Sequence, residues 1–296
     1  MVGAFYSNLK ALLSEGNNTS IISDTNNTKI LSKNKEDNNL MLFTSKGNLS
    51  IIKLLISKGA IINDTDNNGF TPLMIACEKG YDNIVNFLLL KKADINIKNI
   101  NGDNCLTIAS IFNKFDIVKI LLENNNNKID IHNKNYDGFD AITIASQFGY
   151  TNIVELLLLN GANPNSKCNG NTPLLYGSQN GHVDVVKLLI NYKANITERD
   201  IYDWTPIMLA SGFGQIKIIE LLLLNGANIH DKDNNGFNCI MAASHAGFVE
   251  TVKFLLLNKA NAYDKDNNNC DSLSYALTFN HKDVIELLTI NHSHIN

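Results

Sequence analysis

The 296-residue chain contains a single arginine, Arg199, a single tryptophan and only four prolines. Arginine is the side chain that most often reads guanines and grips phosphates with forked hydrogen bonds, so its near-absence argues against nucleic-acid recognition. The net charge of −4 agrees, because nucleic-acid-binding domains usually carry a strong basic excess. We therefore expect no nucleic-acid partner.

Long hydrophobic runs are also missing. A membrane-spanning helix needs about 20 predominantly apolar residues. The longest apolar clusters here, residues 153–159 and 216–224, are interrupted by Glu155, Lys217 and Glu220. The first ten residues lack the basic start and the apolar core of a secretory signal. These absences predict no membrane insertion and a cytoplasmic protein, which would act in the host-cell cytoplasm if the source is a virus or a bacterium that exports it as an effector.

Catalytic and metal-binding signatures are absent from the sequence as well. The five cysteines form no CxxC pair, which favours reduced thiols over a disulfide framework or a zinc site. There is no phosphate-binding GxxxxGK[ST] loop, no HExxH and no GxSxG. A structural role at a turn is the simpler interpretation of His182 and His281, and a frayed tail that of His292 and His294. We predict no catalytic residue, no cofactor and no bound metal.

Asparagine, in contrast, is abundant, with 47 of the 296 residues. Two explanations are open. Asn, Ile and Lys have AT-rich codons, so the excess could reflect the genome of a large virus, a protist or a host-associated bacterium. Alternatively, pairs such as Asn68-Gly69 and Asn235-Gly236 supply the residues that tight hairpin turns require.

The most informative feature is an internal repeat. Its first landmark recurs in steps of 32 to 36 residues, at Gly69, Gly102, Gly138, Gly170, Asp203, Gly236 and Asn269. An insertion around residues 124–128 explains the longest step, and a single deletion near Ser166 explains the shortest. An earlier unit with a degenerate start includes Leu40. The sequence thus contains about eight units in residues 36–296, whereas the N-terminal segment 1–35 does not fit the period and could supply a capping helix at residues 8–15.

Each unit encodes two short helices. In the second unit, Thr71 can cap the first helix, Pro72 suits its first turn, and Gly80 can end it in a left-handed conformation. Helices of about two to three turns are not stable alone in water, so the units must stack on one another as a solenoid. The expected caps of the second helices are Asp82, Thr151, Asp184 and Asp283.

These motifs resemble the ankyrin repeat. The Thr-Pro-Leu opening of that family is present as Thr71-Pro72-Leu73 and Thr172-Pro173-Leu174, and its Gly-His pair as Gly181-His182. Thr-Pro is lost at Asn104-Cys105 and Asn238-Cys239, where we expect weaker helix-starting hydrogen bonds. The resemblance implies an all-α solenoid of helix-turn-helix units with β-hairpin loops.

In this family, the hairpin tips and the outer positions of the first helix line one concave face. The central units place an unusual number of apolar and aromatic residues there: Ile111, Phe112, Phe139, Phe148, Tyr202, Trp204 and Phe213. Exposed aromatic clusters mark binding sites, so these seven residues are the predicted partner-binding residues. The alternative is that the rings pack between neighbouring hairpins and first helices as ordinary contacts between units.

The function that the resemblance implies is a non-enzymatic, monomeric scaffold for protein–protein interaction. Its partner would be an unidentified protein or peptide bound on the concave face. The alternative is a substrate-recognition adaptor of an enzyme assembly such as a ubiquitin ligase. Because the chain ends shortly after its last helical pattern, we expect no appended adaptor segment, and recruitment would depend on the repeats.

Overall fold

The computed structural model describes residues 35–124 and 128–293. The chain divides into two units, Met1–Lys35 and Glu36–Asn296. Apart from Lys35, the first unit lies outside the described residues, and so does the capping helix predicted at residues 8–15. The side chains of His292 and His294 also lie outside the described part of the chain.

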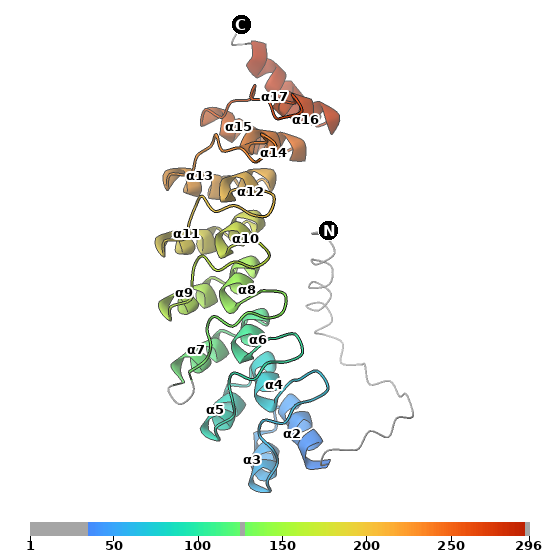
Figure 1. The fold of residues 1–296 in the computed structure, drawn as a ribbon, viewed down its shortest axis with the longest axis vertical. Coiled ribbons are helices and arrows are strands. Elements are labelled where there is room, and N and C mark those ends of the chain that lie inside the picture. Colours follow the sequence, from blue (N-terminus) through green and yellow to red (C-terminus); the bar gives the residue numbers. More distant parts are fainter. Residues whose placement is uncertain (1–34, 125–127, 294–296) are drawn as a thin grey trace, which may run out of the picture. The chain divides into compact units, whose positions relative to one another are not determined.

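The described residues form sixteen helices, which pair in chain order into eight helix-turn-helix repeats (Figure 1). The first helix of each repeat has an even label and the second an odd label, so that repeat 1 is α2–α3 and repeat 8 is α16–α17. The bounds are α2 Lys35–Ser45, α3 Leu49–Ser57, α4 Pro72–Lys79, α5 Asp82–Leu90, α6 Cys105–Ile111, α7 Phe115–Glu123, α8 Ala141–Phe148, α9 Thr151–Leu159, α10 Pro173–Asn180, α11 Val183–Asn191, α12 Pro206–Gly212, α13 Ile216–Leu224, α14 Cys239–Ala246, α15 Val249–Leu257, α16 Ser272–Thr278 and α17 Lys282–Ser293.

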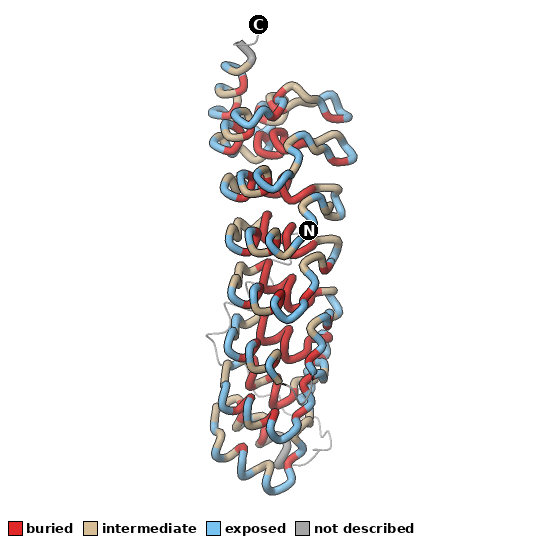
Figure 2. Tube along the Cα trace, turned by 90° about the vertical axis from the view of Figure 1, so that its left-hand side faces the viewer, coloured by how far each residue is buried: buried red, intermediate tan, exposed pale blue. Residues whose placement is uncertain are grey.

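The helices of Glu36–Asn296 form two layers. Even-numbered helices contact one another in succession from α4 to α16, and odd-numbered helices do so from α5 to α17. The core lies between the layers, and Figure 2 shows buried residues along the whole stack. One leucine position of the second helix is at most 1% exposed in seven repeats, at Leu88, Leu121, Leu157, Leu189, Leu222, Leu255 and Leu288. The predicted all-α solenoid is confirmed.

The predicted start and end of the first helix are confirmed in repeat 2. Thr71 Oγ1 accepts a hydrogen bond from the Met74 N–H at 3.2 Å, and Gly80 ends α4 with φ of 78°. The expected weakening where Thr-Pro is lost is wrong. Asn104 and Asn238 take over the cap, because asparagine is as good an N-cap acceptor as threonine.

The predicted caps of the second helices are also wrong. The residue at the N-cap of α5 is Tyr81 and that of α11 is His182, and neither side chain makes a capping hydrogen bond. Asp82 is the first residue of α5, whereas Asp184 and Asp283 are the second residues of α11 and α17, so all three lie in the first turn of their helices. A carboxylate there still stabilises the helix through its interaction with the helix dipole.

The loops between repeats are hairpin turns with very little β pairing. In the described residues, β bridges occur only as two isolated pairs, Cys168 with Asn171 and Lys232 with Asn238. Each loop is called here the hairpin of the repeat whose first helix follows it. The hairpins project from the edge of the even-numbered layer in Figure 1.

Candidate functional site

The hairpins are built around one side chain. In the hairpin of repeat 2, Asp66 Oδ1 accepts hydrogen bonds from the N–H groups of Asn68 and Phe70, both at 2.8 Å. This Asx turn fixes the loop without a regular strand ladder. The equivalent acceptors in other hairpins are Asn99, Asn135, Asp200, Asp233 and Asp266.

The hairpin of repeat 5 is one residue shorter than the others. Cys168 and Asn171 exchange two backbone hydrogen bonds of 2.8 Å across its turn, whereas Asp66 pairs with Phe70, four residues away. Cys168 therefore takes the place of the Asx residue, and the structure puts the deletion that was predicted near Ser166 in this turn. The side chain of Cys168 is 1% exposed, and its Sγ donates to the carbonyl oxygen of Asp137 at 3.3 Å.

Repeats 3 to 5 hold a group of apolar side chains between hairpins and first helices, separate from the main core. We call it the central cluster: Phe139, Ile144, Cys168 and Tyr176, all buried, with Ile111 and Phe148 packed against them. The ring centroids of Phe139 and Tyr176 lie 5.9 Å apart. The four buried side chains are almost completely removed from water, whereas Ile111 and Phe148 are partly buried.

Repeats 6 to 8 hold a row of rings on the same face, which we call the ring column: Trp204, Phe237, Tyr275, His245 and Phe279. Trp204 stacks on Phe237 with 5.5 Å between centroids, and Phe237 meets Tyr275 edge to face at 5.0 Å. His245 lies 6.1 Å from Tyr275 and 4.2 Å from Phe279. Burial, and secondarily the charge of His281, lowers the pKa of His245, so its ring is neutral near pH 7.

Two carboxylates hold this column. Asp233 Oδ2 accepts from Trp204 Nε1 at 3.2 Å, and Asp266 Oδ2 accepts from the hydroxyl of Tyr275 at 2.5 Å. Burial raises the pKa of Tyr275 far above its usual range, and the hydrogen bond to Asp266 raises it further. The phenol therefore stays protonated and keeps donating at any physiological pH.

Of the seven predicted partner-binding residues, some are exposed as a binding surface requires, and others pack between neighbouring repeats. Tyr202 and Phe213 are 62% and 46% exposed, as a binding surface requires. Phe139 is only 5% exposed and belongs to the central cluster. The other four are partly buried: Ile111, Phe112, Phe148 and Trp204.

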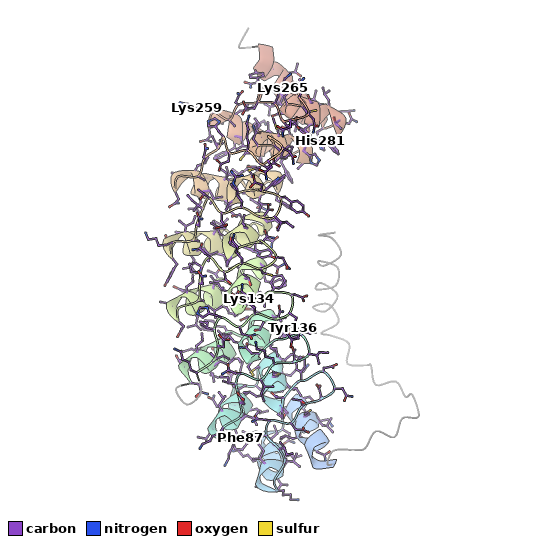
Figure 3. The ribbon with its side chains drawn as sticks, in the orientation of Figure 1. Phe87, Lys134, Tyr136, Lys259, Lys265 and His281 are labelled. Atoms are coloured by element: carbon purple, nitrogen blue, oxygen red, sulfur yellow. The ribbon has the colours of Figure 1, made fainter. Side chains whose placement is uncertain are left out.

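Two exposed aromatic residues of the same face were not among those seven. Tyr136, at the hairpin of repeat 4 (Figure 3), is 77% exposed, and Phe279, after α16, is 48% exposed. Both occupy the register positions that define the face, so the repeat alignment alone was the signal that could have found them. Phe279 lies in repeat 8, outside the central repeats that contain the seven predicted residues.

The histidines and thiols of the described residues have structural surroundings. His182 Nε2 lies 3.0 Å from the carbonyl oxygen of Gln147, and His281 Nε2 lies 2.9 Å from that of His245. All five cysteines are free thiols, and burial raises the pKa of Cys168 and of Cys239 to about 12. Within the described part of the chain, no three His, Cys, Asp or Glu side chains are grouped as a metal site would need.

None of the helices in the residues that the structure describes is long and apolar enough to cross a membrane. Eight helix pairs joined by hairpins, with a core shared between neighbours, define a helical-repeat solenoid. The family model described as ankyrin repeats (3 copies) matches residues 2–99, 88–168, 158–233 and 207–296. The chain therefore belongs to the ankyrin-repeat family. A search of curated proteins finds no match to it.

Proposed function

We propose that the chain is a non-enzymatic scaffold that binds a protein or peptide partner on the face formed by its hairpins and first helices. Ankyrin repeats are generally protein–protein interaction modules, which supports the class of function. The observation that supports this face is its exposed aromatic surface: Tyr136, Tyr202, Phe213 and Phe279. Aromatic side chains with a large exposed fraction are costly in water and often dominate binding energy.

The seven predicted residues have different parts in this proposal. Tyr202 and Phe213 contact the partner directly, because much of each ring is exposed. Ile111 and Phe148 offer one edge to the partner while they pack against the central cluster, and Trp204 does so while it packs against the main core. Phe112 is also partly exposed while it packs against the main core. Phe139 is buried and holds its neighbours in place without contacting the partner.

The test is a double substitution of exposed residues, Tyr202→Ala with Phe213→Ala. The matched control is Leu224→Ala with Leu257→Ala, whose side chains are 79% and 83% exposed at the ends of second helices. Tagged protein is recovered from its native cells and the copurifying proteins are quantified by mass spectrometry. We expect the aromatic pair to lose the partner and the leucine pair to keep it, with unchanged circular dichroism for both. Equal recovery by both variants would show that this face is not the binding site.

The adaptor alternative requires a second surface, and one observation favours it. Four leucines at the last position of second helices are 66–83% exposed, at Leu90, Leu159, Leu224 and Leu257. An adaptor would bind its substrate on the aromatic face and the enzyme on this leucine row. In the same experiment, the leucine pair would then lose a different set of proteins from the aromatic pair, including enzyme subunits.

We further propose that the protein is a cytoplasmic monomer. Five free thiols support a reducing compartment. The oligomeric state is measured by light scattering after size exclusion, with a monomer mass expected. A dimer mass that persists on dilution contradicts this part of the proposal.

A further inference from the structure

The Asx position of the hairpins is charged in repeat 2, where it is Asp66, and in repeats 6 to 8, but not in repeats 3 to 5. It is Asn99, Asn135 and Cys168 in repeats 3 to 5, but Asp200, Asp233 and Asp266 in repeats 6 to 8. The turn itself does not need the charge. Asn99 Oδ1 accepts two backbone N–H groups of its own hairpin, both at 2.9 Å. Asp233 Oδ1 accepts the two equivalent N–H groups of its hairpin, both at 2.8 Å.

Within residues 35–124 and 128–293, the three carboxylates form no ion pair. Arg199, the single arginine of the chain, pairs with Asp203 at 3.0 Å and also donates to the carbonyl oxygen of Lys232. Lys232 itself pairs with Asp264 at 3.2 Å. Among the described residues, none forms an ion pair with Asp200, Asp233 or Asp266.

Their charge is also partly desolvated. Asp233 and Asp266 are 9% and 8% exposed, and Asp200 is partly buried. Burial raises the pKa of Asp200, and the nearby charges of Asp203 and Asp233 raise it further, against the hydrogen bonds from Tyr202 and Trp204 that lower it. Charges in such surroundings act over longer distances than charges in water.

This charge is transmitted to the rings. The indole N–H of Trp204 and the hydroxyl of Tyr275 each donate to one of the carboxylates. A donor that bonds to an anion is polarised, and its aromatic ring becomes richer in electrons. Electron-rich ring faces attract ammonium and guanidinium groups. The lysines that lie over a ring in the described residues do so at Phe43 and Phe87, away from the column.

The hairpin edge as a whole has the same sign. Together the seven hairpin segments contain fifteen Asp and Glu against seven Lys and Arg, although the whole chain has a net charge of only −4. The segments are residues 60–71, 93–104, 128–140, 162–172, 194–205, 227–238 and 260–271. A cationic segment approaching this edge is therefore attracted before it makes contact.

We propose that the ring column and its three aspartates bind lysine or arginine side chains of an extended segment of the partner protein. This inference rests on the proposed function, since it names the chemistry of the partner at repeats 6 to 8. The cationic groups lie against the rings of Trp204, Tyr275 and Phe279, near Asp200. The aliphatic part of each side chain packs on Tyr202 and Phe213.

The experiment uses the full chain and a library of random short peptides displayed on phage. We expect selection at physiological salt to enrich peptides that are rich in lysine and arginine. One enriched peptide is then synthesised, and its affinity is measured by fluorescence anisotropy. The triple variant Asp200→Asn, Asp233→Asn, Asp266→Asn should bind it about tenfold more weakly, from three lost charge interactions of modest size each.

The control triple variant is Asp66→Asn, Asp94→Asn, Asp130→Asn, which removes the same charge from the hairpins of repeats 2 to 4. Each of these carboxylates also accepts a backbone N–H two residues further on, so the structural change is matched. We expect its affinity to stay within about twofold of the unmodified chain, because long-range screened charge contributes little. Asp200→Asn alone, which leaves the column bonds of Asp233 and Asp266 intact, should weaken binding by about twofold.

The outcomes separate the two proposals. Enrichment of peptides without excess lysine or arginine overturns this inference and leaves the proposed function standing. Equal binding of a basic peptide by the unmodified chain and by the Asp200→Asn triple variant overturns it as well. Failure to enrich any peptide, together with recovery of the same proteins by the aromatic pair, contradicts the proposed function itself.

Discussion

The central cluster and the ring column occupy the same face of the same fold, yet they differ in exposure and charge. In the central cluster, Phe139 and Tyr176 are 5% and 8% exposed beside neutral Asx positions. In the ring column, Phe279 is 48% exposed and the Asx positions are carboxylates. The same repeat positions therefore hold covered rings beside neutral residues in repeats 3 to 5, and rings that keep more exposed surface beside carboxylates in repeats 6 to 8.

The shortened hairpin of repeat 5 is the last hairpin of the central cluster and precedes the first hairpin of the ring column. Neighbouring hairpins are joined by backbone hydrogen bonds from the Ile100 N–H to Asn68 O and from the Tyr136 N–H to Asn101 O. A similar bond joins Asn267 to Asn235. With its deletion, repeat 5 instead buries the Cys168 side chain under the preceding hairpin. Cys168 thus contributes a buried apolar side chain to the central cluster, at a position where most other hairpins have a polar Asx residue.

The largest expected effect is a loss of stability when a cavity is made in the central cluster. Phe139→Ala should lower the free energy of unfolding by about 3 kcal/mol, because a buried ring is replaced by an empty space. Phe279→Ala is the matched control in the ring column and should cost well under about 1 kcal/mol. Both are measured by urea denaturation. Equal losses would mean that the column supports stability as much as the cluster does.

A smaller effect is expected at the carboxylate under Tyr275. Burial alone would raise the pKa of Asp266, but the hydrogen bonds from Tyr275 and from two backbone N–H groups lower it below 3.8. Its stabilisation is therefore fully present above pH of about 3.8 and is lost as the pH falls through the lowered value. Asp266→Asn should cost about 1–2 kcal/mol at pH 7. The difference from the unmodified chain should vanish in acid, as thermal unfolding at several pH values can show.

The matched carboxylate two repeats earlier, Asp200, should behave in the opposite way. The pKa of Asp200 is raised by burial and by neighbouring carboxylates, so its ionised form opposes folding at neutral pH and protonation relieves this as the pH falls. Asp200→Asn should therefore leave the thermal midpoint at pH 7 unchanged or slightly higher. A clear decrease would contradict the view that this charge is kept for binding.

The smallest effect concerns the thiols. Burial raises the pKa of Cys168 to about 12, and Cys77, Cys105 and Cys239 are fully buried, whereas Cys270 is partly exposed in the hairpin of repeat 8. A thiol-reactive probe at mildly alkaline pH should label Cys270 alone in the folded chain, with no change in stability. Peptide mapping identifies the site. Rapid labelling of Cys168 would show that the central cluster opens readily.

Much of the fold could be predicted from the repeat itself. The positions of Leu73, Ala76 and Gly80 recur in most units, and each helix is too short to stand alone, so stacking was the expected solution. The caps were harder to predict. Whether Thr205 or Asn104 caps its helix depends on the local path of the chain, and only Asn104 makes the hydrogen bond.

The candidate site shows the same limit. Phe139, Trp204 and Phe237 occupy equivalent hairpin positions, but Phe139 is buried and the other two are only partly so. The neighbours decide this difference. Tyr176 comes from the next repeat to cover Phe139, whereas Trp204 and Phe237 stack on each other and hold part of their surface open.

The near-absence of arginine has a structural counterpart. Arg199, the single arginine, joins the hairpin of repeat 6 to that of repeat 7, and no described residue forms an ion pair with Asp200, Asp233 or Asp266 beside the ring column. The sequence alone determined the period, the helix pairs and the class of fold, because burial recurs at fixed positions in every unit. Only the tertiary structure decided which rings are covered and which carboxylates stay unpaired, because those properties depend on the residues that neighbouring repeats bring into contact.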